Sequence, residues 1–191
     1  MATTTAPTSE VEISEFLRAC AAQQSPVEVR GGGTRGGLGR PSQAENVLTL
    51  TNHTGVTLYQ PGGLTLLAKA GTPLRDVEAT LAAEGQLLPF EPMDHRGLYG
   101  TSGEPTIGAV VACNISGPRR IQAGACRDYM IGVRFVDGSG EIVKNGPMIL
   151  NGPSIRNRIV KTCPRGSGPS GAGAAAVSAA ASSAPCCVSM S

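Results

Sequence analysis

The chain has 191 residues, 40% of them apolar, which favours one globular domain or one domain with a tail. Its net charge of +2 is far from the basic balance of most nucleic-acid-binding proteins, so we expect no nucleic-acid partner. No apolar run approaches the roughly 20 residues of a membrane span, and the N-terminus lacks the basic start and apolar core of a signal peptide. We therefore expect a cytoplasmic protein without a membrane span. The six cysteines show no metal-ligand spacing, so we expect reduced thiols and no metal site.

The first half of the chain alternates between helical and strand patterns. Residues 1–9 have neither pattern, and we expect them to form a disordered leader. From Ile13 to Cys20, apolar residues recur at the spacing of a buried helix face, and this predicts a helix that ends before Pro26. Short strands are expected over residues 27–29, 47–50, 55–58 and 64–70.

The second half continues the alternation. Thr72 and Pro73 have the chemistry of a helix N-cap and first position, and an apolar stripe then runs from Leu74 to a C-capping Gly85. Further elements are expected as a strand over 86–89, a short buried helix over 107–113, and two strands over 130–136 and 141–144 that flank a turn at 137–140. Strands that alternate with helices indicate an α/β or α+β fold.

The C-terminal part has a different character. After Glu141 there is no acidic residue, and Ala, Ser, Gly and Pro fill most of positions 164–191. Such a segment has little apolar bulk to offset the entropy of ordering it. The sequence therefore divides into a leader (1–9), a patterned domain (10–145) and a divergent, mostly low-complexity and disordered tail (146–191). An out-of-frame or truncated end is an alternative interpretation of this tail.

A glycine-rich run at residues 31–39 follows the first predicted strand. Glycines let backbone N–H groups turn inward around an anion, which suits a pyrophosphate. Gly31, Gly33 and Gly36 match the G-x-G-x-x-G fingerprint, but that fingerprint needs a helix directly after the loop, and Gly39 and Pro41 argue against one. A P-loop is excluded because no Gly-Lys-Ser/Thr follows. A flexible loop without a ligand remains the alternative for this stretch alone.

A second segment, residues 101–141, contains TIGAVVACNISGPRRIQAGACRDYMIGV. Residues 30–39 taken together with 106–117 resemble the PCMH-type FAD-binding domain of the vanillyl-alcohol oxidase superfamily. The run 116–124, then Arg127-Asp128 and Gly132-Val133, is closer still to the FAD-binding subunits of bacterial glycolate oxidases. The passage 70–74 also matches these relatives. The resemblance covers about residues 10–145.

This resemblance implies an α+β fold: a PCMH-type domain of two α/β subdomains, incomplete at its C-terminal end, with FAD extended between them. It also implies the residues that contact FAD. Those of the glycine loop are Arg30, Gly31, Gly32, Gly33, Thr34, Arg35, Gly36, Gly37 and Gly39. Those of the second segment and the last strand are Thr106, Ile107, Gly108, Ala112, Asn114, Ser116, Gly117, Ile142 and Val143. Pro92 and Asp94 are weaker candidates near the flavin. Thr34 stands where some relatives have a flavin-linked histidine, which implies noncovalent FAD.

The implied function is oxidation of a 2-hydroxy acid, such as glycolate to glyoxylate, within a complex that has flavin and iron–sulfur subunits. Two alternatives remain: a noncatalytic assembly subunit without flavin, and a defective truncated product. Ala109 favours the first alternative, since relatives often have paired glycines there. The catalytic base is not identified from the sequence. His53 is expected at the surface and His95 in a structural role.

Overall fold

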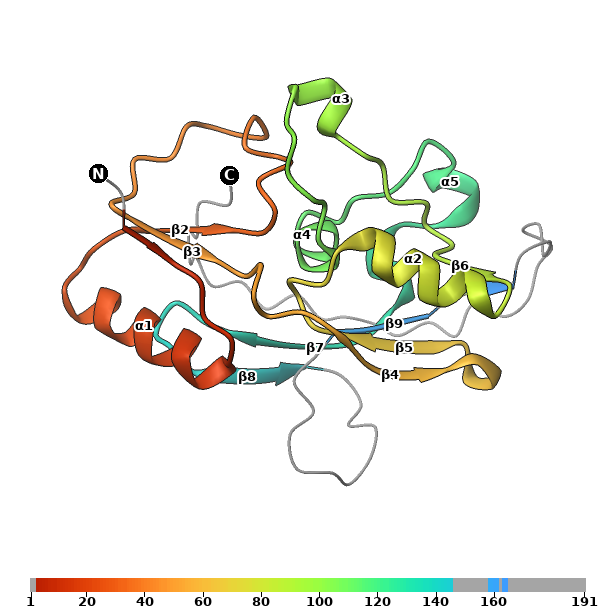
Figure 1. Cartoon of the computed structure of the whole chain (residues 1–191), viewed down its shortest axis with the longest axis horizontal. Helices are drawn as coiled ribbons and strands as arrows, with labels where there is room; N and C mark the ends of the chain where they lie inside the picture. The colour runs from red at the N-terminus through yellow and green to blue at the C-terminus, as the bar shows by residue number, and fades with distance from the viewer. Residues whose placement is uncertain (1–2, 146–157, 162, 165–191) are drawn as a thin grey trace.

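The computed structural model describes residues 3–145, 158–161 and 163–164. Its two main sheets belong to two subdomains (Figure 1). The smaller sheet has three parallel strands in the order β1–β3–β2, and the larger has five antiparallel strands in the order β4–β5–β9–β7–β8. The α+β prediction with two subdomains is therefore confirmed. Among the described residues, no helix has the length and apolar character needed to cross a membrane.

The first subdomain contains the smaller sheet and helix α1. Ser9 caps this helix by accepting a hydrogen bond from the backbone N–H of Glu12, and Ile13 and Cys20 are buried. The elements are β1 (Thr3–Thr5), α1 (Glu10–Ala22), β2 (Val27–Arg30) and β3 (Asn46–Thr49).

The prediction of a disordered leader is wrong for residues 3–9. Strand β1 pairs with the edge of β3, and the His53 ring contacts the Thr8 carbonyl oxygen at 3.0 Å through Nδ1. His53 is itself 4% exposed, so its predicted surface position is also wrong. Both errors have one cause. The N-terminal segment takes its order from backbone pairing with a distant strand, which its composition does not encode.

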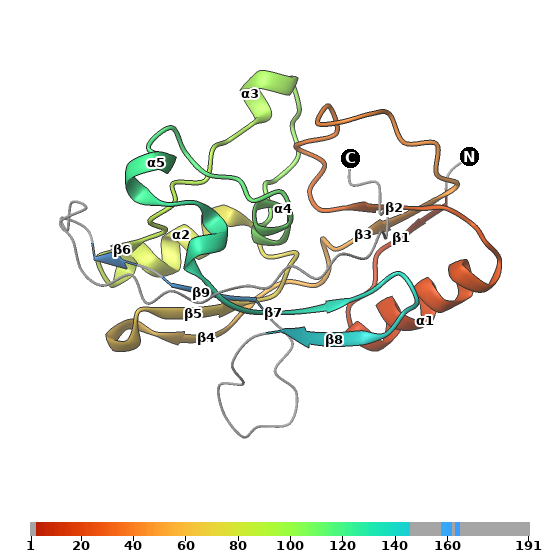
Figure 2. The ribbon, with the colours of Figure 1, turned by 180° about the vertical axis from the view of Figure 1, so that it is seen from behind.

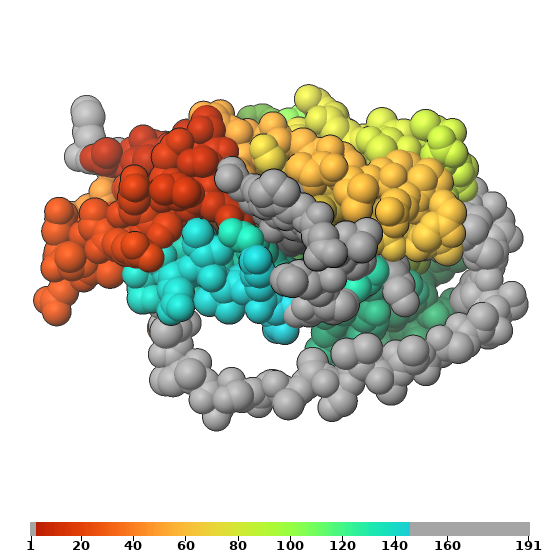
Figure 3. All heavy atoms as spheres, turned by 90° about the horizontal axis from the view of Figure 1, so that it is seen from below, coloured from red at the N-terminus to blue at the C-terminus, as the bar shows by residue number. Residues whose placement is uncertain are grey.

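The two subdomains meet where α1 packs on the β7–β8 hairpin. The Ser14 hydroxyl donates a hydrogen bond to the Gly140 carbonyl at 2.5 Å, and Glu10 pairs with Arg134 at 2.7 Å. Seen from below, the red N-terminal segment lies against the cyan hairpin (Figure 3). The turn at 137–140 predicted for this hairpin is confirmed by the pairing of β7 with β8.

The second subdomain places helices on one face of the larger sheet (Figures 1 and 2). Leu66 of β5, Val77 of α2 and Val110 of α4 are fully buried in this core. The strands are β4 (Val56–Gln60), β5 (Thr65–Ala68), β7 (Met130–Val136), β8 (Ile142–Asn145) and β9 (Arg158–Lys161). The helices are α2 (Leu74–Ala83), α3 (Arg96–Tyr99), α4 (Ile107–Ala112) and α5 (Arg120–Ala123), with 3-10 turns at Pro61–Gly63 and Cys126–Tyr129.

Helix α2 begins one residue later than Thr72 and Pro73 predict. Pro73 occupies the N-cap, and no side chain caps the helix. The Thr72 hydroxyl instead donates to the Lys69 carbonyl at 2.7 Å and accepts from the Gly55 N–H at 2.9 Å. Thr72 thus holds the turn before the helix. Gly85 follows the C-cap with φ +64°, in the left-handed conformation that favours glycine.

The domain was predicted to end at residue 145, but the fold continues beyond that residue. Strand β9 pairs with β5 on one side and β7 on the other, so residues 158–161 complete the larger sheet. Strand β10 (Cys163–Pro164) pairs with β6 (Gln86–Leu87). Four residues carry too little periodicity to reveal such a strand, and its partners are far away in sequence. The remaining tail, for which we predicted disorder, lies outside the described residues.

Candidate functional site

A pocket of about 110 Å³ lies where the glycine loop after β2 faces helix α4. Residues after β3 and β5 complete its walls, so both subdomains contribute. The lining residues are Val29, Arg30, Gly31, Gly32, Gly33, Thr34, Arg35, Gly36, Leu38, Leu50, Ala70, Thr106, Gly108, Ala109, Ala112 and Cys113. Sites that enclose a whole drug-sized ligand measure roughly 300–1,000 Å³, so this pocket has room for one part of an extended ligand.

Two glycines, one in the loop and one in the segment before α4, allow these two segments to pack together. A Cβ on Gly32 would lie 1.7 Å from the Glu104 carbonyl oxygen, and one on Gly103 would lie 1.7 Å from the Gly32 carbonyl oxygen. The backbones of the two segments therefore lie too close together to leave room for a side chain at either glycine. Gly32 is required by packing, whatever the pocket binds.

Gly36 differs from Gly32. It lines the pocket, and a Cβ added there would meet nothing within 4 Å. Gly33 has φ +72°, so this position favours glycine for its backbone conformation. The loop thus combines a packing glycine, a conformational glycine and a pocket-facing glycine, which sequence alone does not distinguish.

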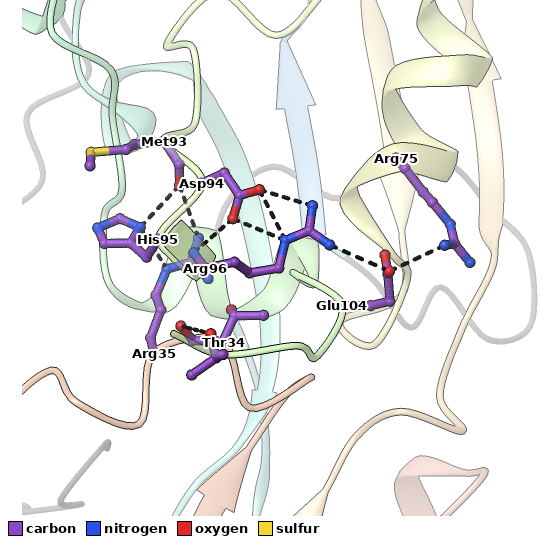
Figure 4. Close-up of polar contacts among 9 residues, drawn as sticks. Thr34, Arg35, Arg75, Met93, Asp94, His95, Arg96 and Glu104 are labelled. Carbon is purple, nitrogen blue, oxygen red and sulfur yellow. Dashed lines mark hydrogen bonds and ion pairs between the residues drawn. The ribbon is translucent and has the colours of Figure 1, made fainter. Parts of the chain in front are cut away.

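Arg35 is the charged side chain of the loop that is buried, with 5% of its surface exposed. Its contacts with His95 and Met93 are drawn in Figure 4. Its Nε lies 3.4 Å from His95 Nδ1, its Nη2 lies 3.5 Å from the Met93 carbonyl oxygen, and its Nη1 has no hydrogen-bond partner. Burial lowers the pKa of the guanidinium, because charge is less stable away from water. On the α4 side of the pocket, the buried Thr106 hydroxyl also has no hydrogen-bond partner among the described residues.

A chain of ion pairs joins Asp94, Arg96, Glu104 and Arg75 (Figure 4). Asp94 pairs with Arg96 at 2.9 Å, and Glu104 receives Arg96 at 3.5 Å and Arg75 at 3.2 Å. Hydrogen bonds from Arg96 hold the pKa of the Asp94 carboxyl below its ordinary value. The charge of Asp94 is therefore paired with that of Arg96. Asp94 does not line the pocket. The chain links the loop at 91–96 to Glu104, whose carbonyl packs on Gly32.

The structure brings together ten of the residues implied by the resemblance, and they line the pocket: Arg30, Gly31, Gly32, Gly33, Thr34, Arg35, Gly36, Thr106, Gly108 and Ala112. The other eight do not line this pocket: Gly37, Gly39, Ile107, Asn114, Ser116, Gly117, Ile142 and Val143. The weaker candidate Pro92 is also outside it.

Several residues outside the pocket have structural contacts instead. Ile107 is 1% exposed in the core, and the Ser116 hydroxyl accepts from the Cys126 backbone N–H at 3.0 Å. Asn114 Oδ1 likewise accepts from the Arg127 N–H at 3.0 Å. Ile142 and Val143 lie in β8, in ladder positions opposite residues of β7.

Sequence reasoning left Ala109 and Cys113 out of the residues expected to contact FAD, although it identified Ala109 as a departure from the relatives. With Gly108 and Ala112 they fall at positions i, i+1, i+4 and i+5 of α4, which is one face of a helix. That spacing was available in the sequence. Leu50 and Ala70 were missed for another reason, since they follow strands whose ends meet the loop only in the folded chain.

The chain resembles known proteins over most of its length. Residues 2–146 match the family described as "FAD binding domain". "Glycolate oxidase subunit GlcE" of Escherichia coli is 35% identical over 136 residues, which cover 71% of this chain and 37% of that protein. "Glycolate oxidase subunit GlcD" of Bacillus subtilis is 28% identical over 74% of this chain and 29% of that protein. "D-2-hydroxyglutarate dehydrogenase" of Xanthomonas citri is 29% identical, over 79% of this chain and 30% of that protein.

The fold also matches a solved structure, a variant of Phl p 4 described as a glucose oxidase. Its TM-score is 0.65 at 17% sequence identity, and the match covers 84% of this chain and 34% of the other. The chain spans about a third of the length of these relatives. The family match over most of the chain and the fold agree, and the chain belongs to the FAD binding domain family.

Proposed function

We propose that this chain is the FAD-binding part of a flavoprotein that oxidises a small 2-hydroxy acid, glycolate to glyoxylate in the favoured case. The observation that carries the proposal is the pocket between the glycine loop and α4, in a chain of the FAD binding domain family. The names of the relatives support the substrate class, since glycolate and 2-hydroxyglutarate are both 2-hydroxy acids.

The pocket residues fit the charged middle part of the cofactor, its diphosphate. Glycines of the loop line the pocket together with Thr34 and Thr106, and Gly36 leaves open space. Backbone N–H groups of Gly31–Gly36 would hold the diphosphate. Because residue 34 is a threonine and not a histidine, it offers no ring nitrogen for a covalent link, and FAD would be bound noncovalently. When bound, the flavin supplies the acceptor for the hydride of the substrate alcohol carbon.

The residues that line this pocket bind and orient a ligand rather than move protons. None of the described residues that line the pocket is a histidine or a carboxylate. The substrate hydroxyl therefore needs a proton acceptor outside this pocket. We propose that the chain works within a larger complex whose other subunits, flavin and iron–sulfur proteins by resemblance, complete the electron path.

A noncatalytic assembly subunit is the second candidate. Ala109 lines the pocket where relatives often have a second glycine, and its methyl group occupies space beside Gly108. On this hypothesis the fold is kept and the cofactor is excluded.

The experiment that separates the candidates is the visible spectrum of the purified protein, with chromatography of any cofactor released on denaturation. A yellow protein that releases FAD supports the proposal, and glycolate-dependent bleaching would extend it to the substrate. A folded, colourless protein that does not quench the fluorescence of added FAD would overturn it in favour of the assembly subunit.

A further inference from the structure

We propose that Tyr99 is a positioning residue for the FAD site: its ring packs on the glycine loop from outside the pocket and holds the loop in its binding conformation. The inference rests on the proposed function and goes beyond it, because Tyr99 acts on FAD binding without contacting the cofactor. Among the described residues that line the pocket, none belongs to the 93–104 segment, whereas Gly31–Gly36 and Leu38 are all included.

The ring of Tyr99 occupies the space that a side chain at position 37 would need. A Cβ added to Gly37 would lie 2.6 Å from Tyr99 Cδ1 and 3.0 Å from Tyr99 Cε1. Helix α3, which ends with Tyr99, and the loop after β2 are on the same side of the molecule in both ribbon views (Figures 1 and 2). The resemblance implied that Gly37 contacts FAD, but in the structure its missing side chain makes room for the ring.

His95 extends the contact to the other neighbour of Gly36. The rings of His95 and Tyr99 are stacked, with centroids 6.0 Å apart and an interplanar angle of 8°. His95 Nδ1 in turn lies 3.4 Å from Arg35 Nε. The two rings therefore contact the loop at residues 35 and 37, on both sides of the pocket-facing Gly36.

Two further contacts join the same two segments. The Thr101 hydroxyl donates a hydrogen bond to the Thr34 carbonyl oxygen at 3.1 Å, and Gly103 packs against Gly32 too closely for a Cβ on either residue. A loop rich in glycine has many conformations when nothing restrains it. Contacts at residues 32, 34, 35 and 37 restrain this one, so the loop and the 93–104 segment form one packed unit.

The exposure of α3 separates Tyr99 from its neighbours. Leu98 is 66% exposed and Gly97 and Gly100 are exposed, whereas Tyr99 is half-buried. Helix α3 contributes no residue to the hydrophobic core cluster of the described chain. A change at Tyr99 should therefore alter the glycine loop while the unfolding temperature of the ligand-free protein stays close to that of the wild type.

The size of the effect follows from the population of the binding conformation. A loop that adopts this conformation a tenth of the time binds its ligand about tenfold more weakly. Tyr99→Ala removes the ring that contacts Gly37 and His95, so we expect FAD and ADP to bind about 5- to 20-fold more weakly. The coupling is reciprocal, so FAD bound to the wild type must in turn stabilise the 93–104 segment.

The test combines fluorescence titration with FAD, competition by ADP, and trypsin cleavage after Arg96, which lies partly exposed in α3. Saturating FAD should slow cleavage after Arg96 in the wild type. In Tyr99→Ala, both affinities should fall and this protection should be lost. Tyr99→Phe keeps the ring and should behave as the wild type. Leu98→Ala changes the exposed neighbour and is the matched control, with affinities and protection unchanged.

Gly37→Ala tests the same contact from the loop. Its Cβ displaces the Tyr99 ring, so FAD binding should weaken about as much as in Tyr99→Ala. In the double variant the space is free, and its affinity should equal that of Tyr99→Ala alone. Additive losses would mean that Gly37 and Tyr99 act separately, which overturns the inference. If Tyr99→Ala does not fold, Gly37→Ala decides, since FAD binding equal to that of the wild type refutes the role.

The remaining outcomes separate this inference from the proposed function. Weaker FAD binding with unchanged ADP binding in Tyr99→Ala would assign Tyr99 to direct contact with the flavin and refute a positioning role. A wild-type protein that binds neither FAD nor ADP refutes both proposals. A wild type that binds both ligands, with Tyr99→Ala binding them equally well, refutes only the role of Tyr99.

Discussion

Replacing Gly36 with valine tests whether the glycine loop holds a ligand or only packs. Gly36 lines the pocket, its φ lies outside the left-handed region, and an added Cβ meets nothing within 4 Å. The folded protein should therefore accept the side chain, with a free energy of unfolding equal to that of the wild type or up to about 1 kcal/mol higher, because valine restricts the unfolded chain. Gly36 borders a cavity of about 110 Å³, so we expect a bulky side chain at this position to weaken FAD binding at least about tenfold, or by about 1.4 kcal/mol.

The matched variant is Gly32→Ala. Its Cβ would lie 1.7 Å from the Glu104 carbonyl oxygen, so the segment before α4 must move, at a cost of about 1–3 kcal/mol of stability. Urea unfolding and FAD titration of both variants separate the two roles. If Gly36→Val binds FAD as tightly as the wild type, the diphosphate does not lie in this pocket. If Gly32→Ala is as stable as the wild type, the close packing of the two segments is not required.

Three further predictions concern other parts of the molecule. Ala109→Gly should strengthen FAD binding several-fold by removing a methyl group from the pocket wall, and unchanged affinity would show that Ala109 does not crowd the cofactor. Glu10→Gln removes the carboxylate that pairs with Arg134 and should lower the free energy of unfolding by about 3 kcal/mol in urea titrations; a loss below about 0.5 kcal/mol would contradict a buried pair. Hydrogen bonds from the Ser139 hydroxyl and the Glu141 N–H lower the pKa of Asp137, so its contribution is present above the unfolded pKa near 4 and is lost as pH falls through the lower folded value. Asp137→Asn should therefore reduce the loss of stability between about pH 6 and about pH 3, and an unchanged loss would show that this turn does not contribute to acid sensitivity.

Local patterns predicted the elements that depend on neighbouring residues. The helix from Glu10, the short helix α4 and the hairpin around 137–140 are each specified by spacing or turn residues within a dozen positions. The same patterns failed for β1 and β9, because each is a short strand whose order comes from pairing with a distant strand. His53 was misplaced for the same reason, since its environment is the N-terminal segment.

The sequence by itself determined the class of cofactor, because the glycine loop and the α4 segment carry their motifs in order and can be recognised without coordinates. Only the tertiary structure decided what each residue of those motifs does. Gly32 packs against Glu104 whereas Gly36 faces the pocket, and both are simply glycine in the sequence. The burial of Arg35, which forms no ion pair with the described residues, is likewise a property of the assembled loops. Distances between segments far apart in the chain depend on how the two sheets pack, and no local pattern contains that information.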